Sequence, residues 1–198
     1  MKSERAKLKI DTLLQRPPKV ALQRGNEPLI APIYQSVKFT FDSFDSMTKN
    51  QMTSFFYSRV SNPTVRQLET QLAELQGRDD AFCVASGVAA ISIPLMALLK
   101  AGDHVILFTE SYMPTRYLVR DLLGKFGVTH TLISTAEAKS LKKHIQRSKT
   151  RLVIFESPTN PSLTVMDIKE ITKEARAEGV LTILDNTFAG FHQHGQYD

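Results

Sequence analysis

The chain has 198 residues, of which 42% are hydrophobic and 23% are charged, and its formal net charge is +5. This length and balance are typical of one globular domain with a hydrophobic core. The sequence has no apolar run long enough to cross a bilayer, and its first residues do not lead into the apolar core of a signal peptide. The single cysteine, Cys83, excludes an internal disulfide framework and is typical of a reducing compartment, so we expect a cytoplasmic protein.

The basic residues are dispersed along the chain, except for a dense run over residues 139–151 that we expect on the exposed face of a helix. Recognition of nucleic acid needs a basic stripe with stacking aromatic residues or a known motif, and the sequence has neither. We therefore expect neither nucleic acid nor membrane as a partner, and the net charge is compatible with attraction for small anionic molecules without showing it.

Residues 1–60 show no alternation of strands and helices. Pro17-Pro18 stops any helix there, and residues 40–47 mix aromatic and polar residues as a loop or a short helix does. We expect this segment to be an arm that wraps over another surface, either this domain or a partner subunit.

From residue 61 onward the pattern is that of an α/β domain. Ser61 or Asn62 can cap an amphipathic helix over 64–76, which ends at Gly77. Cys83 lies between apolar neighbours, which indicates a buried thiol in a strand. Short apolar runs then predict strands at 81–85, 104–109, 128–133, 151–155 and 180–184, with helices at 87–99, 114–126, 137–147 and 167–178. This order predicts a mainly parallel sheet with flanking helices.

Polar residues follow the last two predicted strands, which are rich in branched apolar residues as buried parallel strands are. Glu156 and Asn160 come after the first, and Asp185 and Thr187 after the second. Ligands of such sheets bind beyond the carboxyl ends of the strands, so we expect these four residues to share one crevice.

Two further strand ends carry features of a ligand site. Ser86, Gly87 and Val88 begin a helix, whose free N–H groups can bind a phosphate, although small residues also form ordinary tight turns. Tyr112 follows another strand and can stack on a flat ring, or pack on its neighbours at the rim.

Asp185 is costly to bury unless it has a partner. A protonated pyridine nitrogen suits it through a charge-assisted hydrogen bond; the alternatives are a helix cap or a metal ligand. No cluster with metal spacing accompanies it, and His192 and His194 are typical of a loop surface, so we expect no metal. A phosphate cup, a stacking ring and a carboxylate at a ring nitrogen together indicate pyridoxal phosphate.

Several motifs stand in a fixed order from about Pro32 to the last residue. They are Tyr57-Ser58-Arg59, Asn62-Pro63-Thr64, Ser86-Gly87, the turn at Tyr112, Glu156-Ser157-Pro158-Thr159-Asn160-Pro161 and Asp185-Asn186-Thr187-Phe188. Together they resemble the Cys/Met-metabolism pyridoxal-phosphate enzymes of trans-sulfuration, which include cystathionine γ-synthase, cystathionine β- and γ-lyases and methionine γ-lyase.

The resemblance implies a fold-type-I large domain and a role for each motif. Gly87 and Val88 give backbone N–H groups to the cofactor phosphate, and Tyr112 stacks on the ring and assists deprotonation of the amino-acid substrate. Asp185 contacts the ring nitrogen, and Asn160 and Thr187 lie around the ring and its 3-oxygen. Tyr57 and Arg59 reach the phosphate of a neighbouring subunit in a homo-oligomer, a dimer of dimers, since the guanidinium fork binds phosphate bidentately.

The chain departs from the family pattern in one respect. The family's Schiff-base lysine lies in a Ser-x-Thr-Lys motif beyond the Asp185 segment, whereas no lysine follows Lys173 here, and the family's C-terminal domain is also absent. We therefore expect the N-terminal part of a longer enzyme, inactive by itself.

The sequence leaves two alternatives. The chain can be an inactive remnant or dimerisation partner, or it can belong to another fold-type-I enzyme such as an aminotransferase. The Tyr57-x-Arg59 arm argues against the second.

Overall fold

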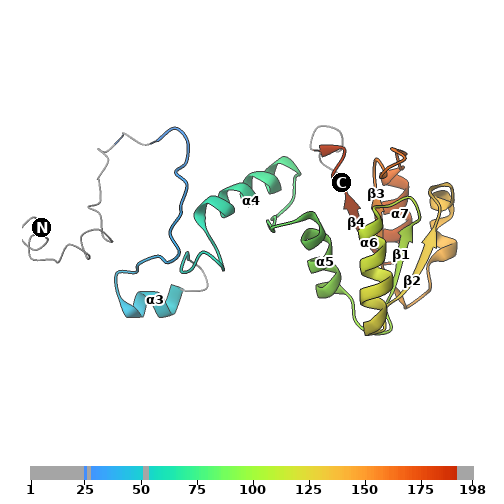
Figure 1. Cartoon of the computed structure of the whole chain (residues 1–198), viewed down its shortest axis with the longest axis horizontal. Helices are drawn as coiled ribbons and strands as arrows, with labels where there is room; N and C mark the ends of the chain where they lie inside the picture. The colour runs from blue at the N-terminus through green and yellow to red at the C-terminus, as the bar shows by residue number, and fades with distance from the viewer. Residues whose placement is uncertain (1–24, 26–27, 51–53, 191–198) are drawn as a thin grey trace, which may run out of the picture. The chain divides into compact units, whose positions relative to one another are not determined.

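The computed structural model describes residues 25, 28–50 and 54–190. It divides the chain into two units, Met1–Thr64 and Val65–Asp198. Figure 1 gives the elements of both. The predicted boundary lay at residue 60. The expectation that the first segment wraps a partner subunit stays a prediction.

Within the first unit, two extended segments lie antiparallel. Lys38 and Tyr57 form a bridge, and the Ser58 N–H donates to the Val37 carbonyl over 2.9 Å. The short helix α3, Phe44–Asn50, lies between these segments in the sequence, where a loop or short helix was expected.

The amphipathic helix predicted over 64–76 is α4, Pro63–Leu75. Asn62 begins it by accepting the Thr64 N–H at Oδ1 over 2.9 Å, and its amide group donates to the Tyr34 carbonyl at the same distance. The predicted cap is therefore confirmed. Gly77 follows the helix with φ +59°, a conformation that costs glycine little.

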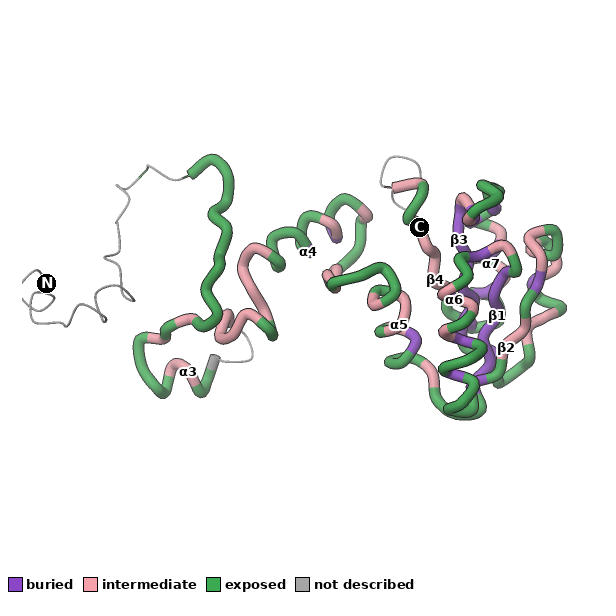
Figure 2. The backbone as a smooth tube through the Cα atoms, in the orientation of Figure 1, coloured by how far each residue is buried: buried purple, intermediate pink, exposed green. Residues whose placement is uncertain are grey.

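The second unit contains a sheet of four parallel strands in the order β2-β1-β3-β4. The strands are β1 His104–Phe108, β2 Thr129–Ile133, β3 Thr150–Glu156 and β4 Leu181–Asp185. The predicted α/β architecture with a parallel sheet is confirmed. β1 and β3 are buried along nearly their whole length, as Figure 2 shows.

Helices cover both faces of this sheet. One face packs on the helical segment η3, Thr135–His144, and on α7, Ile168–Ala177. The other packs on α5, Gly87–Leu98, through Leu95, and on the helical stretch that comprises α6 Met113–Tyr117, η1 Leu118–Leu122 and η2 Leu123–Phe126. Because side chains alternate along each strand, even-numbered residues of β3 face α5 and odd-numbered residues face α7. Among the described residues, no helix combines the length and the apolar character that crossing a membrane requires.

The strand expected at 81–85 is absent, so the sheet of the described residues has four strands, not five. The Cys83 N–H donates to Glu69 Oε1 of α4 over 2.9 Å instead of joining a ladder. Arg66 fixes the start of this segment through Asp80, at 2.7 Å. Cys83 is half-buried and outside any strand, which corrects its interpretation as a buried strand thiol.

Two predicted helices have a different local form. The helix expected over 114–126 changes from α to π to 3₁₀ geometry along its length. The helix expected over 137–147 is a 3₁₀ segment over Thr135–His144, broken at Ser140, where φ is −126°. In both cases apolar residues still reach the core, Val119 in one and Leu141 in the other. Packing therefore decides the path of the backbone more than helix propensity does.

β4 was expected to be buried but is largely half-buried. It pairs with β3 on one side only and forms one edge of the sheet that the described residues build. On the side of β4 that faces away from β3, the backbone groups have no strand partner among the described residues.

A buried histidine links three strands near their amino ends. The side chain of His104 is 0% exposed, and its ring nitrogens lie 2.8 Å from Thr150 Oγ1 and 2.8 Å from Thr131 Oγ1. Burial lowers the pKa of His104, and the nearby charges of His130 and Lys149 lower it further. The ring is therefore held neutral.

We predict that this histidine makes folding sensitive to acid. Below about pH 6.5 an unfolded imidazole binds a proton that the folded one refuses, so the unfolding free energy falls as the pH drops from there through the lowered pKa of His104. Between about pH 7.5 and about pH 5.5, His104 should lower the unfolding free energy by up to about 1.4 kcal/mol. His104→Gln, which cannot titrate, should show a smaller loss in urea unfolding. Equal pH dependence in wild type and His104→Gln would contradict the prediction.

Candidate functional site

Several of the residues that the sequence indicated lie at or just after the carboxyl ends of β1, β3 and β4. Glu156 and Asp185 are paired in the register of β3 and β4, and the Ser157 N–H donates to the Asp185 carbonyl over 3.4 Å. Both side chains follow the alternation of their strands onto the face that α5 covers. Two of the four strand-end polar residues that were expected to share one crevice are therefore neighbours in the sheet.

Glu156 connects this pair to Tyr112. Its side chain is 3% exposed, and Oε2 accepts the backbone N–H of Tyr112 over 2.9 Å. The backbone N–H of Asn160 lies near this carboxylate and favours its charged form. Burial raises the pKa of Glu156 and the charge of Asp185 adds to the rise, while the two N–H donors oppose it.

Asp185 is fixed from one side only. Its Oδ1 accepts the Thr187 hydroxyl over 2.5 Å and the Thr187 N–H over 3.1 Å. Within the described part of the chain, Oδ2 accepts from no group. A half-buried carboxylate with one oxygen held and one available can accept a hydrogen bond from a protonated ring nitrogen.

Asn160 lies in a loop whose backbone is held at several points. Ser157 Oγ accepts the Met166 N–H over 3.1 Å, and Thr159 Oγ1 accepts the Thr164 N–H over 3.0 Å. Thr159 and Ser157 are both buried. The loop therefore presents Asn160 from a rigid support.

Beside Asp185, Asn186 has a buried Oδ1 with no hydrogen-bond partner among the described residues, while its amide group donates to the Gly190 carbonyl over 3.0 Å. An unsatisfied buried acceptor is costly. Asn186 directly follows Asp185 at the end of β4.

The predicted phosphate cup is the first turn of α5. Ser86 Oγ accepts the Ala89 N–H over 3.2 Å, and the Ser86 carbonyl accepts the Ala90 N–H over 3.0 Å. This leaves the N–H groups of Gly87 and Val88 without an acceptor in the described part of the chain, and these are the two predicted to bind phosphate. A Cβ added to Gly87 would meet no atom within 4 Å, so the approach to this backbone is open.

The path of the chain places this cup at the same edge of the sheet as the carboxylates. α5 packs on their face of the sheet through Leu95, and residues 99–103 lead from its end to the start of β1. The helix is about 18 Å long, close to the length of a strand. Its first turn therefore lies toward the carboxyl ends of the strands (Figure 1). No hydrogen bond joins Ser86, Gly87 or Val88 directly to Tyr112 or Asp185 among the described residues.

Tyr57 and Arg59 belong to the first unit and are described by themselves. The Arg59 guanidinium lies 5.1 Å from the centroid of the Tyr57 ring, so the two form a cation–π pair. Their predicted role at another subunit stays a prediction.

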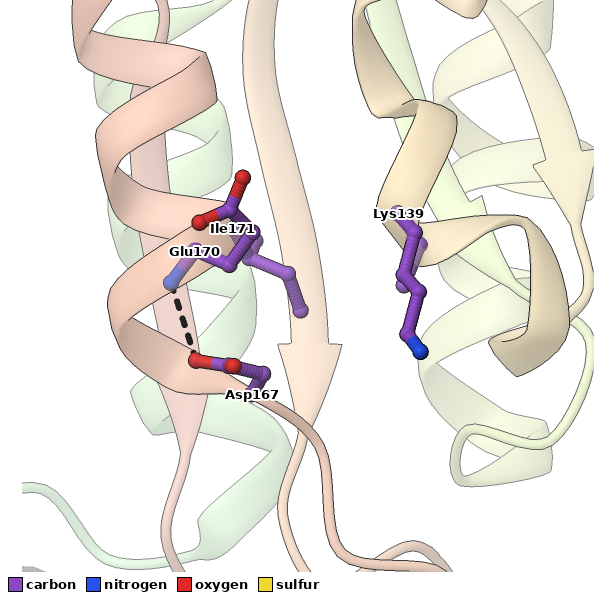
Figure 3. A pocket seen from close by; sticks show the side chains of 5 residues that line it. Lys139, Asp167, Glu170 and Ile171 are labelled. Carbon is purple, nitrogen blue, oxygen red and sulfur yellow. Dashed lines mark hydrogen bonds between the residues drawn. The ribbon is translucent and has the colours of Figure 1, made fainter.

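A separate hollow of about 250 Å³ lies between η3 and α7. Figure 3 shows Lys139 on one side and Asp167, Glu170 and Ile171 on the other. Asp167 accepts the Glu170 N–H over 3.0 Å and so caps α7. None of the predicted site residues lines this hollow.

Sequence reasoning placed Glu156 in the crevice but assigned it no contact. Its backbone partners could not be identified from the sequence, because they depend on the path of two loops. The available signal was a glutamate at the end of a buried strand, next in register to Asp185.

Comparison with known proteins identifies the family. The profile of the Cys/Met metabolism PLP-dependent enzymes matches residues 19–193, and the chain belongs to this family. It is 34% identical to L-methionine gamma-lyase of Pseudomonas putida over 177 residues, which cover 85% of this chain and 44% of that protein. It is 36% identical to cystathionine beta-lyase of Lactococcus lactis subsp. cremoris over 170 residues, which cover 86% of this chain and 43% of that protein.

Among solved structures, a putative O-acetylhomoserine (thiol)-lyase of Campylobacter jejuni has a TM-score of 0.73 and 32% identity, over 79% of this chain and 39% of that one. That structure contains a pyridoxyl-lysine phosphate group. The predicted family is thus confirmed, and pyridoxal phosphate is confirmed as the cofactor of the family. This chain spans less than half the length of these relatives.

We predict that Ser86 stabilises the first turn of α5. Ser86→Ala removes the acceptor of the Ala89 N–H and should lower the unfolding free energy by about 1 kcal/mol. Ser92→Ala is the matched control inside the same helix, because the Ser92 hydroxyl donates only to the Ala89 carbonyl, at 3.4 Å. Urea unfolding measures both, and equal effects of the two variants would contradict a capping role.

Proposed function

We propose that this chain is the cofactor-binding part of a pyridoxal-phosphate enzyme of sulfur amino-acid metabolism. The reaction of the whole protein is formation of a C–S bond, or β- or γ-elimination, on cystathionine or an activated homoserine. The observation that carries the proposal is the Asp185 carboxylate, held at Oδ1 by Thr187 with Oδ2 available, at the carboxyl edge of a parallel sheet. Membership of the family supports the same conclusion.

The residues present fit the cofactor. The open N–H groups of Gly87 and Val88 suit its phosphate, and Ser86 holds the turn that presents them. The ring of Tyr112 is 38% exposed at the end of β1, where it can stack on a flat ring. Asn160 and Thr187 supply polar groups around that ring.

When bound, pyridoxal phosphate supplies an electron sink for the carbanion that forms at the substrate Cα. Asp185 contributes by keeping a proton on the ring nitrogen through a charge-assisted hydrogen bond. Tyr112 covers one ring face and can assist removal of the Cα proton, as the resemblance implies. The covalent lysine would come from a Ser-x-Thr-Lys segment after Asp198.

We retain the prediction that Tyr57 and Arg59 bind the phosphate held by a neighbouring subunit in a homo-oligomer. Their cation–π pairing supports this, because it keeps the planar guanidinium and the phenol together as one unit. A cytoplasmic location remains part of the proposal.

The coding sequence after Asp198 separates the enzyme from the alternative of an inactive remnant or dimerisation partner. A Ser-x-Thr-Lys motif shortly downstream supports the enzyme. A stop codon directly after Asp198 would exclude catalysis by this chain.

We predict that the 198-residue chain binds pyridoxal phosphate without forming a covalent adduct at one specific lysine. Lys173, the last lysine, is exposed on α7 and belongs to no site described above. Borohydride reduction followed by peptide mass analysis should find no single modified lysine. A stoichiometric adduct at one position would contradict this.

Asp185→Asn should weaken that binding about fivefold to tenfold, because it replaces a charge-assisted hydrogen bond of about 1.5–3 kcal/mol by a neutral one of about 0.5–1.5 kcal/mol. Equilibrium ultrafiltration with absorbance detection measures the dissociation constant. Asp167→Asn is the matched control, since it removes the same charge at the cap of α7 and asparagine also caps helices. Equal affinities of Asp185→Asn and Asp167→Asn would count against the proposed site.

A further inference from the structure

The buried carboxylate of Glu156 has no role in the chemistry outlined above, yet it adjoins several parts of the site. Its Oε2 accepts the backbone N–H of Tyr112, after β1, over 2.9 Å, and the backbone N–H of Asn160, in the loop after β3, lies close enough to lower its pKa. It also lies next to Asp185 in the register of β3 and β4. One side chain thus touches or adjoins three strand ends that carry proposed site residues.

The two donors come from segments that have no ladder to hold them. Tyr112 is the residue before α6, with φ −48° and ψ 123°, and no side chain caps that helix. Asn160 lies in a loop in which the side chains of Ser157 and Thr159 accept backbone N–H groups. Without Glu156, the N–H of Tyr112 would lose this acceptor and the N–H of Asn160 would lose the carboxylate beside it, so both segments would relax toward other partners.

The two neighbouring carboxylates therefore have different tasks. Glu156 is buried and accepts the backbone N–H of Tyr112, whereas Asp185 is only half-buried and keeps Oδ2 available among the described residues. A buried carboxylate that binds backbone within the protein orients structure, and one with an available oxygen can contact a ligand.

We propose that Glu156 is a positioning residue that sets the distance between Tyr112 and Asp185, and thereby the slot into which the cofactor ring fits. The identity of the ring rests on the proposed function. The positioning of the two backbone segments does not, because it depends only on contacts within the chain.

The first test is amide hydrogen exchange by NMR on the full 198-residue chain. In Glu156→Gln the side chain loses the negative charge that attracts both backbone N–H groups, so its hold on them weakens. The exchange rates of the Tyr112 and Asn160 amides should rise at least about tenfold relative to wild type. Unchanged rates at both amides would overturn the proposal.

A matched control lies at the same edge of the sheet. Glu110 also follows β1 and accepts a backbone N–H, that of Thr135 at 3.1 Å, but it contacts none of the proposed site residues. Glu110→Gln should leave the exchange of the Tyr112 and Asn160 amides unchanged. If it accelerates them as much as Glu156→Gln does, the effect is general and the positioning role fails.

The second test is the dissociation constant for pyridoxal phosphate, which a purely structural role would leave unchanged. We expect Glu156→Gln to raise it at least about tenfold, since the slot is misaligned while every direct ligand contact remains. Ile171→Val weakens the core on the opposite face of the sheet and should leave the constant as in wild type. Equal affinities of wild type and Glu156→Gln would overturn the proposal.

A second variant keeps both tests usable if Glu156→Gln does not fold. Glu156→Asp retains the charge but withdraws the oxygens by one methylene, so it should also accelerate both amides and weaken binding. If Glu156→Asp binds pyridoxal phosphate as tightly as wild type, the proposal that the carboxylate must extend as far as that of glutamate is overturned. If wild type itself does not bind pyridoxal phosphate, the proposed function fails, while the exchange rates still decide the role of Glu156.

Discussion

The structure depends on the central strand β3. It pairs with β1 on one side and β4 on the other, and its residues from Leu152 to Glu156 are all buried. Because β3 is parallel to both of its neighbours, the carboxyl ends of β1, β3 and β4 lie at the same edge of the sheet. Residues that are far apart in the sequence therefore meet at this edge. Each face of β3 also anchors one helix layer, which means that the core and the candidate site share the same support.

Much of this could be predicted from the sequence, because buried parallel strands consist of short apolar runs and their ends carry polar residues. β1, β2, β3 and β4 were found in this way. The strand expected at 81–85 is absent from the structure. An apolar run indicates a preference for burial, but it does not show that a neighbouring strand is available for pairing. In the structure, Glu69 satisfies the Cys83 N–H that a neighbouring strand would otherwise have bound.

The sequence predicted those site residues that lie at or just after the end of a strand, because the carboxyl ends of parallel strands lie at one edge of the sheet. Asp185, Asn160 and Tyr112 were named from their positions after apolar runs, and the structure connects them through backbone pairing and Glu156. The role of Glu156 was not predictable, because its partners are backbone groups that any residue would supply. The π and 3₁₀ segments after Tyr112 were equally hidden, because their apolar spacing fits an ordinary helix.

The open edge of β4 has a consequence for the chain in solution. Its outward backbone N–H and C=O groups have no strand partner within the described residues, and Leu181 beside them is 48% exposed. Such an edge is a template on which another extended segment can add, and no proline interrupts β4 to prevent it. Edge-to-edge addition of copies is therefore one route by which this chain would aggregate, and a strand paired with β4 would close that route while extending the sheet beside Asp185.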